Sequence, residues 1–192
     1  EIKKNLPREC FHKICVVGGG LTGAIMTLML KKSNLFRSDE IGWIKPKIKD
    51  FNDIRTTFFN EKSLELLRGL NLLKNLESSD YTFINKIQVF GMNSFSPLEW
   101  DYSNPRLNFG AVIKNDIILK SVIEQLKDIK HYESLVTNTQ HDDFERTLYL
   151  KDKTIIKTYL VLAADGKNSY LRKLLSIKAF QKKINHVALS GF

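Results

Sequence analysis

Three glycines near the start of the chain stand at the spacing of a phosphate-binding turn. Gly18, Gly20 and Gly23 form the pattern G-x-G-x-x-G, with Leu21 and Thr22 between the last two. In such a turn the first glycine permits a tight bend, the second lets the backbone approach a pyrophosphate, and the third lets the following helix pack closely. Free N–H groups at the start of that helix favour a bound phosphate. The spacing therefore predicts a dinucleotide-binding turn.

The residues around this turn supply the structural context that the motif requires. Residues 13–17 are a short β-branched run typical of a buried parallel strand, and residues 24–32 are expected to form a helix. A second strand is expected at residues 41–44, stopped by Pro46. Strand, glycine turn, helix and strand in this order make a βαβ unit. We therefore favour dinucleotide binding over glycine-rich packing without a ligand.

The end of the second strand departs from the dinucleotide-binding pattern. An acidic residue is expected there to bind the ribose hydroxyls, but the sequence has Lys45, with Lys47 nearby. In one interpretation these lysines recognise a 2′-phosphate, which favours NADP. In the other, the acidic contact is lost, and each lost hydrogen-bond partner costs about 1–3 kcal/mol. The motif alone does not choose between them.

Further elements are expected along the rest of the chain. Residues 61–68 read as a helix with Asn60 as its N-cap and Gly69 as its stop. The remaining expected elements are a strand at 86–90, an amphipathic helix at 116–129, a hairpin of 147–150 and 154–159, and a buried strand at 159–163. The fold class that follows is α/β, with a parallel sheet in a Rossmann-like domain.

Composition and charge exclude several other classes of function. The formal net charge is +9, but the lysines are spread along the chain without a long basic run, so we expect no nucleic-acid partner. Contact with anionic lipid head groups stays open. Cys10 and Cys15 form neither a disulfide framework nor a metal site, so no metal is expected and a reducing, cytoplasmic compartment is the default.

The uncharged run over residues 14–30 allows an alternative of a different class. It is close to the lower length limit for a membrane span, and Gly19 and Gly23 have the spacing of a helix-pairing motif. Glycine weakens a helix by about 1 kcal/mol relative to alanine, and three stand together here. Two elements joined by a glycine turn explain the run better than a membrane anchor.

Two later segments carry patterns that occur together in one known family. Asp53–Arg55 reads D-x-R, and Asp165–Arg172 reads D-G-x-x-S-x-x-R. With the glycine turn, this set resembles the class A flavoprotein aromatic hydroxylases. Asn60 and Ser63, together with residues 110–115, are most similar to the ubiquinone-biosynthesis hydroxylases of that class. The resemblance runs from about residue 13 to about residue 177.

The resemblance implies an FAD site made by residues from several segments. Gly18, Gly20, Leu21, Thr22 and Gly23 would hold the pyrophosphate, and Arg55 and Asn115 would lie near the flavin, although Asp116 replaces an arginine common beside that asparagine. Asp165 and Gly166 would lie near both FAD and the pyridine nucleotide. Two plainer interpretations involve no cofactor. In one, Arg55 is a surface residue paired with Asp53, and in the other, Asp165–Gly166 is an ordinary strand-to-helix turn.

The activity that the resemblance implies is an FAD-dependent monooxygenase with NAD(P)H as reductant. Its substrate would be a hydrophobic phenolic quinone precursor, hydroxylated on the aromatic ring. No catalytic side chain is assigned, because the cofactor carries the chemistry. Peripheral association with a membrane, on the mitochondrial matrix side in a eukaryote, or with a quinone-biosynthesis complex stays open.

The resemblance also implies a division into domains. Residues 1–85 and 111–177 would form the FAD-binding domain, 86–110 part of an inserted mixed or antiparallel substrate-domain sheet, and 178–192 the start of a truncated substrate domain. The family's later G-D segment is not present before Phe192, and the first residue is not Met. These features suggest a fragment, or an inactive nucleotide-binding remnant of a truncated flavoprotein.

Overall fold

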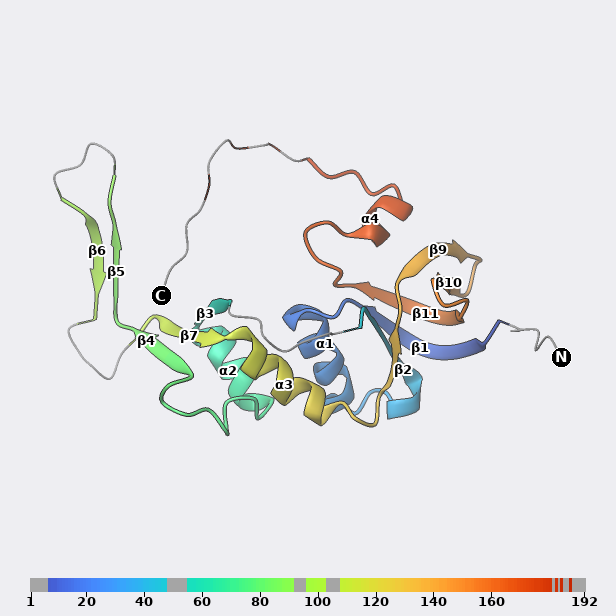
Figure 1. Ribbon diagram of the computed structural model, residues 1–192, viewed down its shortest axis with the longest axis horizontal. Helices are drawn as coiled ribbons and strands as arrows, with labels where there is room; N and C mark the ends of the chain where they lie inside the picture. The colour runs from blue at the N-terminus through green and yellow to red at the C-terminus, as the bar shows by residue number, and fades with distance from the viewer. Residues whose placement is uncertain are drawn as a thin grey trace.

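A six-stranded sheet is the largest element of the computed structural model, which describes residues 7–47, 55–91, 96–102, 108–180, 182, 184 and 187. The strand order is β8-β2-β1-β11-β10-β9. In chain order the strands are β1 (Glu9–Val17), β2 (Ile41–Lys45), β8 (Lys130–Glu133), β9 (Val136–His141), β10 (Arg146–Leu150) and β11 (Ile155–Ala163). Because β8, β2, β1 and β11 are parallel, their carboxyl ends meet at one edge of the sheet (Figure 1).

Three helices contribute to the larger hydrophobic core. α1 (Leu21–Lys32) packs directly on one face of this sheet, α3 (Asn115–Gln125) packs on α1, and α2 (Glu61–Gly69) belongs to the same core. The short 3-10 helix η1 (Ser38–Glu40) precedes β2. Leu28 of α1, Trp43 of β2 and Val122 of α3 are buried together in this core. Asn60 caps α2 as predicted, since its side-chain oxygen accepts a hydrogen bond from the backbone N–H of Ser63 at 2.9 Å.

The opposite face of the sheet has a smaller core. Cys15, Ile44 and Leu148 are buried there with Leu171 of α4 (Tyr170–Leu174). Cys15 is a fully buried free thiol, as a small apolar residue in a strand would be. On this face, α4 therefore packs against strands of the six-stranded sheet.

Two smaller sheets lie beyond the helices. A three-stranded antiparallel sheet has the order β3-β7-β4, made by β3 (Thr56–Asn60), β4 (Tyr81–Ile84) and β7 (Gly110–Lys114). A two-stranded ribbon of β5 (Lys86–Val89) and β6 (Leu98–Asp101) protrudes from the rest of the chain (Figure 1). The α/β fold class with a parallel sheet is confirmed.

The structure corrects two expectations about secondary structure and one about burial. The helix predicted over residues 116–129 ends at Gln125, although Leu126 and Ile129 remain buried after it. The second hairpin strand and the strand predicted at 159–163 are one continuous strand, β11. The prediction that residues 159–163 are buried is wrong: Tyr159 is 60% exposed and Leu160 51% exposed. Their backbones lie in the sheet, but their side chains are covered only in part, as by the edge-on contact of the Phe11 ring with Tyr159.

Residues 14–30 are divided between β1, the glycine turn and α1. An uninterrupted membrane-spanning helix over this run is therefore wrong. Among the residues that the structure describes, none of the helices is long and apolar enough to cross a membrane.

Candidate functional site

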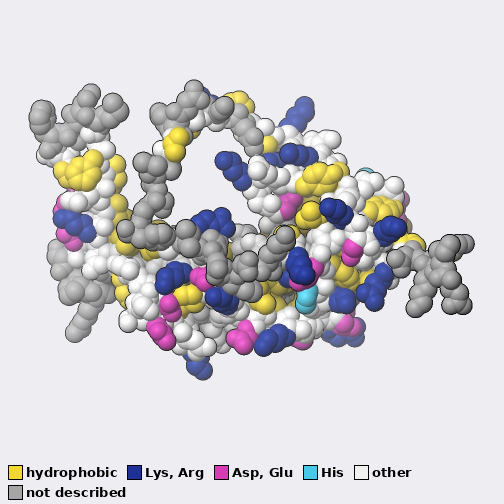
Figure 2. Space-filling view, viewed as in Figure 1, with side chains coloured by type: hydrophobic (Ala, Val, Ile, Leu, Met, Phe, Trp, Pro, Cys, Tyr) yellow, Lys and Arg dark blue, Asp and Glu magenta, His cyan; other side chains and the backbone are white. Residues whose placement is uncertain are grey.

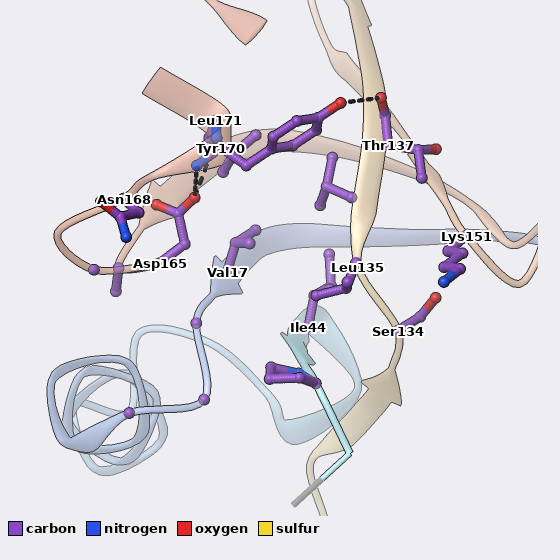
Figure 3. A pocket seen from close by; sticks show the side chains of 17 residues that line it. Val17, Ile44, Ser134, Leu135, Thr137, Lys151, Asp165, Asn168, Tyr170 and Leu171 are labelled. Carbon is purple, nitrogen blue, oxygen red and sulfur yellow. Dashed lines mark hydrogen bonds between the residues drawn. The ribbon is translucent and has the colours of Figure 1, made fainter. Parts of the chain in front are cut away.

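A cavity of about 600 Å³ opens at the edge where the parallel strands end (Figure 3). Its walls come from the β1–α1 turn, the end of β2, the β8–β9 connection, the β10–β11 turn and the segment from β11 into α4. The lining residues are Val17, Gly18, Gly19, Gly20, Ile44, Pro46, Ser134, Leu135, Val136, Thr137, Lys151, Ala164, Asp165, Gly166, Asn168, Tyr170 and Leu171. Open α/β sheets bind ligands in a crevice at this edge.

The glycines of the turn are required for different reasons. A Cβ on Gly18 would lie 2.1 Å from the Ala164 carbonyl oxygen, and the φ of Gly18 is +142°. A Cβ on Gly23 would lie 2.3 Å from the Gly18 carbonyl oxygen. A Cβ on Gly20 would meet nothing within 4 Å, so this position leaves open space on the cavity wall. Gly18 and Gly23 are therefore needed for packing, whereas Gly20 leaves room for a ligand.

Two hydrogen bonds fasten the turn to the neighbouring strand β2. The backbone N–H of Gly18 donates to the Ile44 carbonyl at 2.9 Å. The indole Nε1–H of Trp43, a buried side chain, donates to the Gly18 carbonyl at 2.8 Å. The position of the turn is thus determined by β2 as well as by β1.

Helix α1 begins at the cavity without a side-chain cap. Gly20 is its N-cap, and the first turn contains no acidic residue. The first intrahelical bond runs from the Ala24 N–H to the Gly20 carbonyl at 3.0 Å, so the N–H groups of residues 21–23 have no acceptor within the helix. Such a helix start attracts an anion through its N–H groups and its dipole.

Asp165 and Gly166 form the part of the cavity wall that lies next to Gly18, and they lead into α4. The Asp165 carboxylate accepts hydrogen bonds from the backbone N–H groups of Tyr170 at 2.7 Å and Leu171 at 3.1 Å (Figure 3). Partial burial opposes its ionisation, but hydrogen bonds from Ser169, Leu171 and Tyr170 outweigh this and lower the pKa of Asp165. These bonds are those of a plain strand-to-helix turn, and Gly166 has the left-handed φ of +85° that such a turn needs. A role toward a cofactor stays a prediction.

Arg55 and Asn115 lie together in another place, at the joined ends of β3 and β7. The Asn115 N–H donates to the Arg55 carbonyl at 3.0 Å, and its side-chain oxygen accepts from the Thr57 hydroxyl at 2.6 Å. Asp53 lies outside the described residues. The predicted site residues thus form two groups, one around the cavity and one beside β3.

Several lining residues were not expected from the sequence. The connection from residue 134 to 137 forms one wall, and the Tyr170 hydroxyl reaches across to the Thr137 carbonyl at 3.5 Å (Figure 3). The sequence contains no signal for this wall, because β8 is a four-residue strand in which only Tyr132 is buried. Its place beside β2 follows from tertiary pairing.

Lys45 is not available as a free cation at the cavity. Its side chain is 7% exposed, and its ammonium lies 3.4 Å from the Glu133 carboxylate. The same ammonium lies 5.5 Å from the centre of the Trp43 ring. Its charge is therefore satisfied within the protein.

Comparison with known proteins agrees with the resemblance that the motifs indicate. The chain is 25% identical over 195 residues to the mitochondrial ubiquinone biosynthesis monooxygenase COQ6 of Drosophila melanogaster, covering 92% of this chain and 40% of the relative. It is 25% identical over 192 residues to the 3-demethoxyubiquinol 3-hydroxylase of Escherichia coli (strain K12), covering 90% of this chain and 45% of the relative. The similarity to ubiquinone-biosynthesis hydroxylases is confirmed. No protein-family model matches the chain.

Solved structures share the fold. PqsL of Pseudomonas aeruginosa superimposes with a TM-score of 0.72 at 15% identity, over 91% of this chain and 48% of PqsL. The flavin-dependent monooxygenase PieE, in complex with FAD and substrate, gives a TM-score of 0.68 at 14% identity, over 88% of this chain and 32% of PieE. The chain spans less than half the length of each of these relatives.

Proposed function

We propose that the chain is the nucleotide-binding portion of an FAD-dependent monooxygenase. The observation that carries this proposal is the uncapped start of α1 at a glycine-walled cavity, where the carboxyl ends of parallel strands meet. A diphosphate needs close backbone approach and unpaired N–H groups, and the turn at Gly18–Gly20 supplies both conditions.

The residues present fit FAD at this site. Gly20 leaves space where a side chain would stand, and Gly18 and Gly23 let strand and helix approach each other. We assign the diphosphate to this turn and to the first residues of α1, Leu21 and Thr22. The adenosine half is assigned to the largely apolar wall of Pro46, Leu135 and Val136.

The remaining predicted residues are assigned to the other end of the cofactor. Arg55 and Asn115 would lie near the flavin, where a guanidinium can pair with phosphate or ring oxygen. Asp165, through its hydrogen bonds to the start of α4, positions that helix against the cavity. On the basis of the family resemblance, we also propose domain boundaries at residues 85/86, 110/111 and 177/178.

Bound FAD, reduced by NAD(P)H, would supply the oxygen-activating chemistry for hydroxylation of an aromatic ring. The side chains of this portion bind and orient the cofactor and exclude water from its adenosine half. None is proposed as a catalytic acid or base.

The proposed substrate is a hydrophobic phenolic precursor of ubiquinone. The names of the relatives, a ubiquinone biosynthesis monooxygenase and a 3-demethoxyubiquinol 3-hydroxylase, support this assignment. Peripheral membrane or complex association, mitochondrial in a eukaryote, belongs to the same proposal. The alternative is a remnant that binds the nucleotide without turnover.

The test is to titrate the purified chain with FAD and with ADP. Calorimetry measures the binding of both ligands, and flavin absorbance measures the binding of FAD. Gly20→Ala should fold normally, because its Cβ meets no atom and its φ is −79°, but it should bind both ligands more weakly. Gly69→Ala, at the end of α2, is the matched control, since a Cβ there also meets no atom. Equal ligand binding by both variants would reject the proposed site. Binding of ADP but not of FAD would favour the remnant.

A further inference from the structure

The missing acidic residue of β2 has a counterpart on the adjacent strand. β2 pairs in parallel with β8, and the last pair in register is Lys45 with Glu133. Both residues therefore stand at the carboxyl edge of the sheet. The Lys45 ammonium and the Glu133 carboxylate are 3.4 Å apart.

The two partners differ in their exposure to solvent. The Lys45 side chain is 7% exposed, whereas the Glu133 side chain is 44% exposed. A buried ammonium is stabilised only when it is paired, and here the carboxylate and the Trp43 ring provide that pairing. The carboxylate has two oxygens and more lone pairs than one ammonium uses. It therefore keeps accepting capacity toward solvent.

The pair lies at the rim of the cavity. The residues that follow the two partners, Pro46 and Ser134, both line it. A Cβ on Gly19 of the glycine turn would lie 3.1 Å from the Lys45 Cβ and 3.2 Å from the Pro46 Cδ. Lys45 is thus beside the glycine turn, and Glu133 lies on the far side of Lys45, in ion-pair contact with it and next to the lining residue Ser134.

We infer that Glu133 is the carboxylate that accepts hydrogen bonds from the ribose hydroxyls of the bound adenosine, with Lys45 as the residue that positions it. This inference rests on the proposed function. The acidic residue thus stands on β8 and not on β2. Lys45, at the β2 position where the acid is expected, holds the Glu133 carboxylate at the sheet edge through the ion pair. A carboxylate there accepts from a 2′-hydroxyl and repels a 2′-phosphate.

The competing assignment, in which Lys45 recognises a 2′-phosphate, agrees less well with the structure. It requires the ammonium to leave both Glu133 and the Trp43 ring and to emerge from a nearly closed position. It also brings the phosphate up to the half-exposed Glu133 carboxylate. The cofactor selected by this rim is therefore an unphosphorylated adenosine dinucleotide.

The experiment measures binding of ADP, 2′-deoxy-ADP and adenosine 2′,5′-bisphosphate to the full chain by calorimetry. The unaltered chain should bind ADP about ten-fold or more tightly than 2′-deoxy-ADP, as expected for a hydrogen bond to a charged group. Glu133→Gln should bring the two affinities to within about three-fold, mainly by weakening ADP, because the charge-assisted part of that bond is lost. Glu124→Gln, at an exposed position of α3, should retain the full ratio.

Folding of the variants is controlled separately. Because Glu133→Gln leaves Lys45 without its carboxylate, the double variant Lys45→Met/Glu133→Gln removes both charges, and it should show the same loss of discrimination. An unchanged ratio in both variants overturns the role of Glu133 while the proposed function stands. Tighter binding of adenosine 2′,5′-bisphosphate than of ADP also overturns it, in favour of Lys45. Failure of the unaltered chain to bind any of the three overturns the proposed function itself.

Discussion

Apolar side chains are buried near the carboxyl edge of the six-stranded sheet but exposed to solvent on the β5–β6 ribbon. In β1, Cys15 and Val16 are completely buried, with helices on one face and α4 on the other. In the ribbon, Leu98 is 66% exposed, Val89 51% and Trp100 47%. The hydrophobic side chains on the protruding ribbon are visible at the left of Figure 2.

The other face of the ribbon is polar and ordered by ion pairs. The Lys86 ammonium lies 2.7 Å from Glu99 and 3.7 Å from Asp101, and Gln88 donates to Glu99 at 2.6 Å. The alternation of polar and apolar residues thus produces two distinct faces. Exposed ion pairs contribute about 0–1 kcal/mol each, and a two-stranded hairpin alone is only marginally stable.

Substitutions in these two regions should therefore have effects of different size. The glycine turn at the carboxyl edge of the sheet is held by buried packing and by hydrogen bonds to its neighbours, so small changes there should have large effects. The ribbon contributes little to that core, so changes there should leave the cavity intact.

Gly18→Ala should be the most damaging single change. Its Cβ would lie 2.1 Å from the Ala164 carbonyl oxygen at a φ of +142°. Overpacking and backbone strain together should cost about 2–5 kcal/mol of unfolding free energy. Urea denaturation measures this loss, and nucleotide binding should disappear with it. A cost no larger than that of Gly69→Ala would contradict the close approach of β1 and β11.

Trp43→Phe should have the next largest effect. It removes the buried Nε1–H donor to the Gly18 carbonyl while keeping an aromatic ring. The unpaired carbonyl should cost about 1–3 kcal/mol in unfolding free energy. Weaker ADP binding should accompany it, because the turn is less firmly positioned. Loss of stability with unchanged ADP affinity would show that packing around Trp43 does not position the glycine turn for binding. It would contradict the predicted link between the buried core and the cavity.

The third prediction concerns pH and the buried His12. Its Nδ1–H donates to the Asp39 carbonyl at 2.9 Å and its Nε2 accepts from the Tyr132 hydroxyl at 2.7 Å. Burial lowers the pKa of His12 below its ordinary value of 6.5, although the nearby Asp39 opposes this. The unfolded chain then binds the proton first, so stability is complete above pH 6.5 and falls as the pH drops below it.

The free energy of unfolding should change by at most about 1.4 kcal/mol per pH unit through the titration of His12 alone. Denaturation curves between neutral pH and the range just above carboxylate titration measure it. His12→Gln should flatten that dependence, whereas His141→Gln, at an exposed position, should not. A pH dependence that persists in His12→Gln would assign the effect to another group.

The smallest effect is expected in the ribbon. Glu99→Gln removes an exposed ion pair with Lys86 and should change unfolding free energy by less than about 0.5 kcal/mol. ADP affinity should be unaltered. Thermal melting and calorimetry on the same sample test both statements. A loss comparable to that of Trp43→Phe would show that the ribbon is part of the same cooperative unit as the sheet.

Features encoded by neighbouring residues could be predicted from the sequence. The βαβ unit around Gly18–Gly23, the Asn60 cap and the hairpin of β10 and β11 each depend on residues close in the chain. Two parts of the cavity wall, the glycine turn and Asp165–Gly166, belong to this group. The burial of Tyr159 and Leu160 was mispredicted, because an apolar run does not specify whether another element covers it.

The local sequence requires the sharp glycine turn from β1 into α1, since only residues without a Cβ tolerate the contacts at Gly18 and Gly23. The pairing of β8 with β2 depends on the packing of distant segments, and this pairing brings Glu133 to Lys45 and places residues 134–137 in the cavity wall. Local conformation follows from the sterics of a few adjacent residues. The pairing of distant strands follows from the burial summed over the whole chain, which no short segment contains.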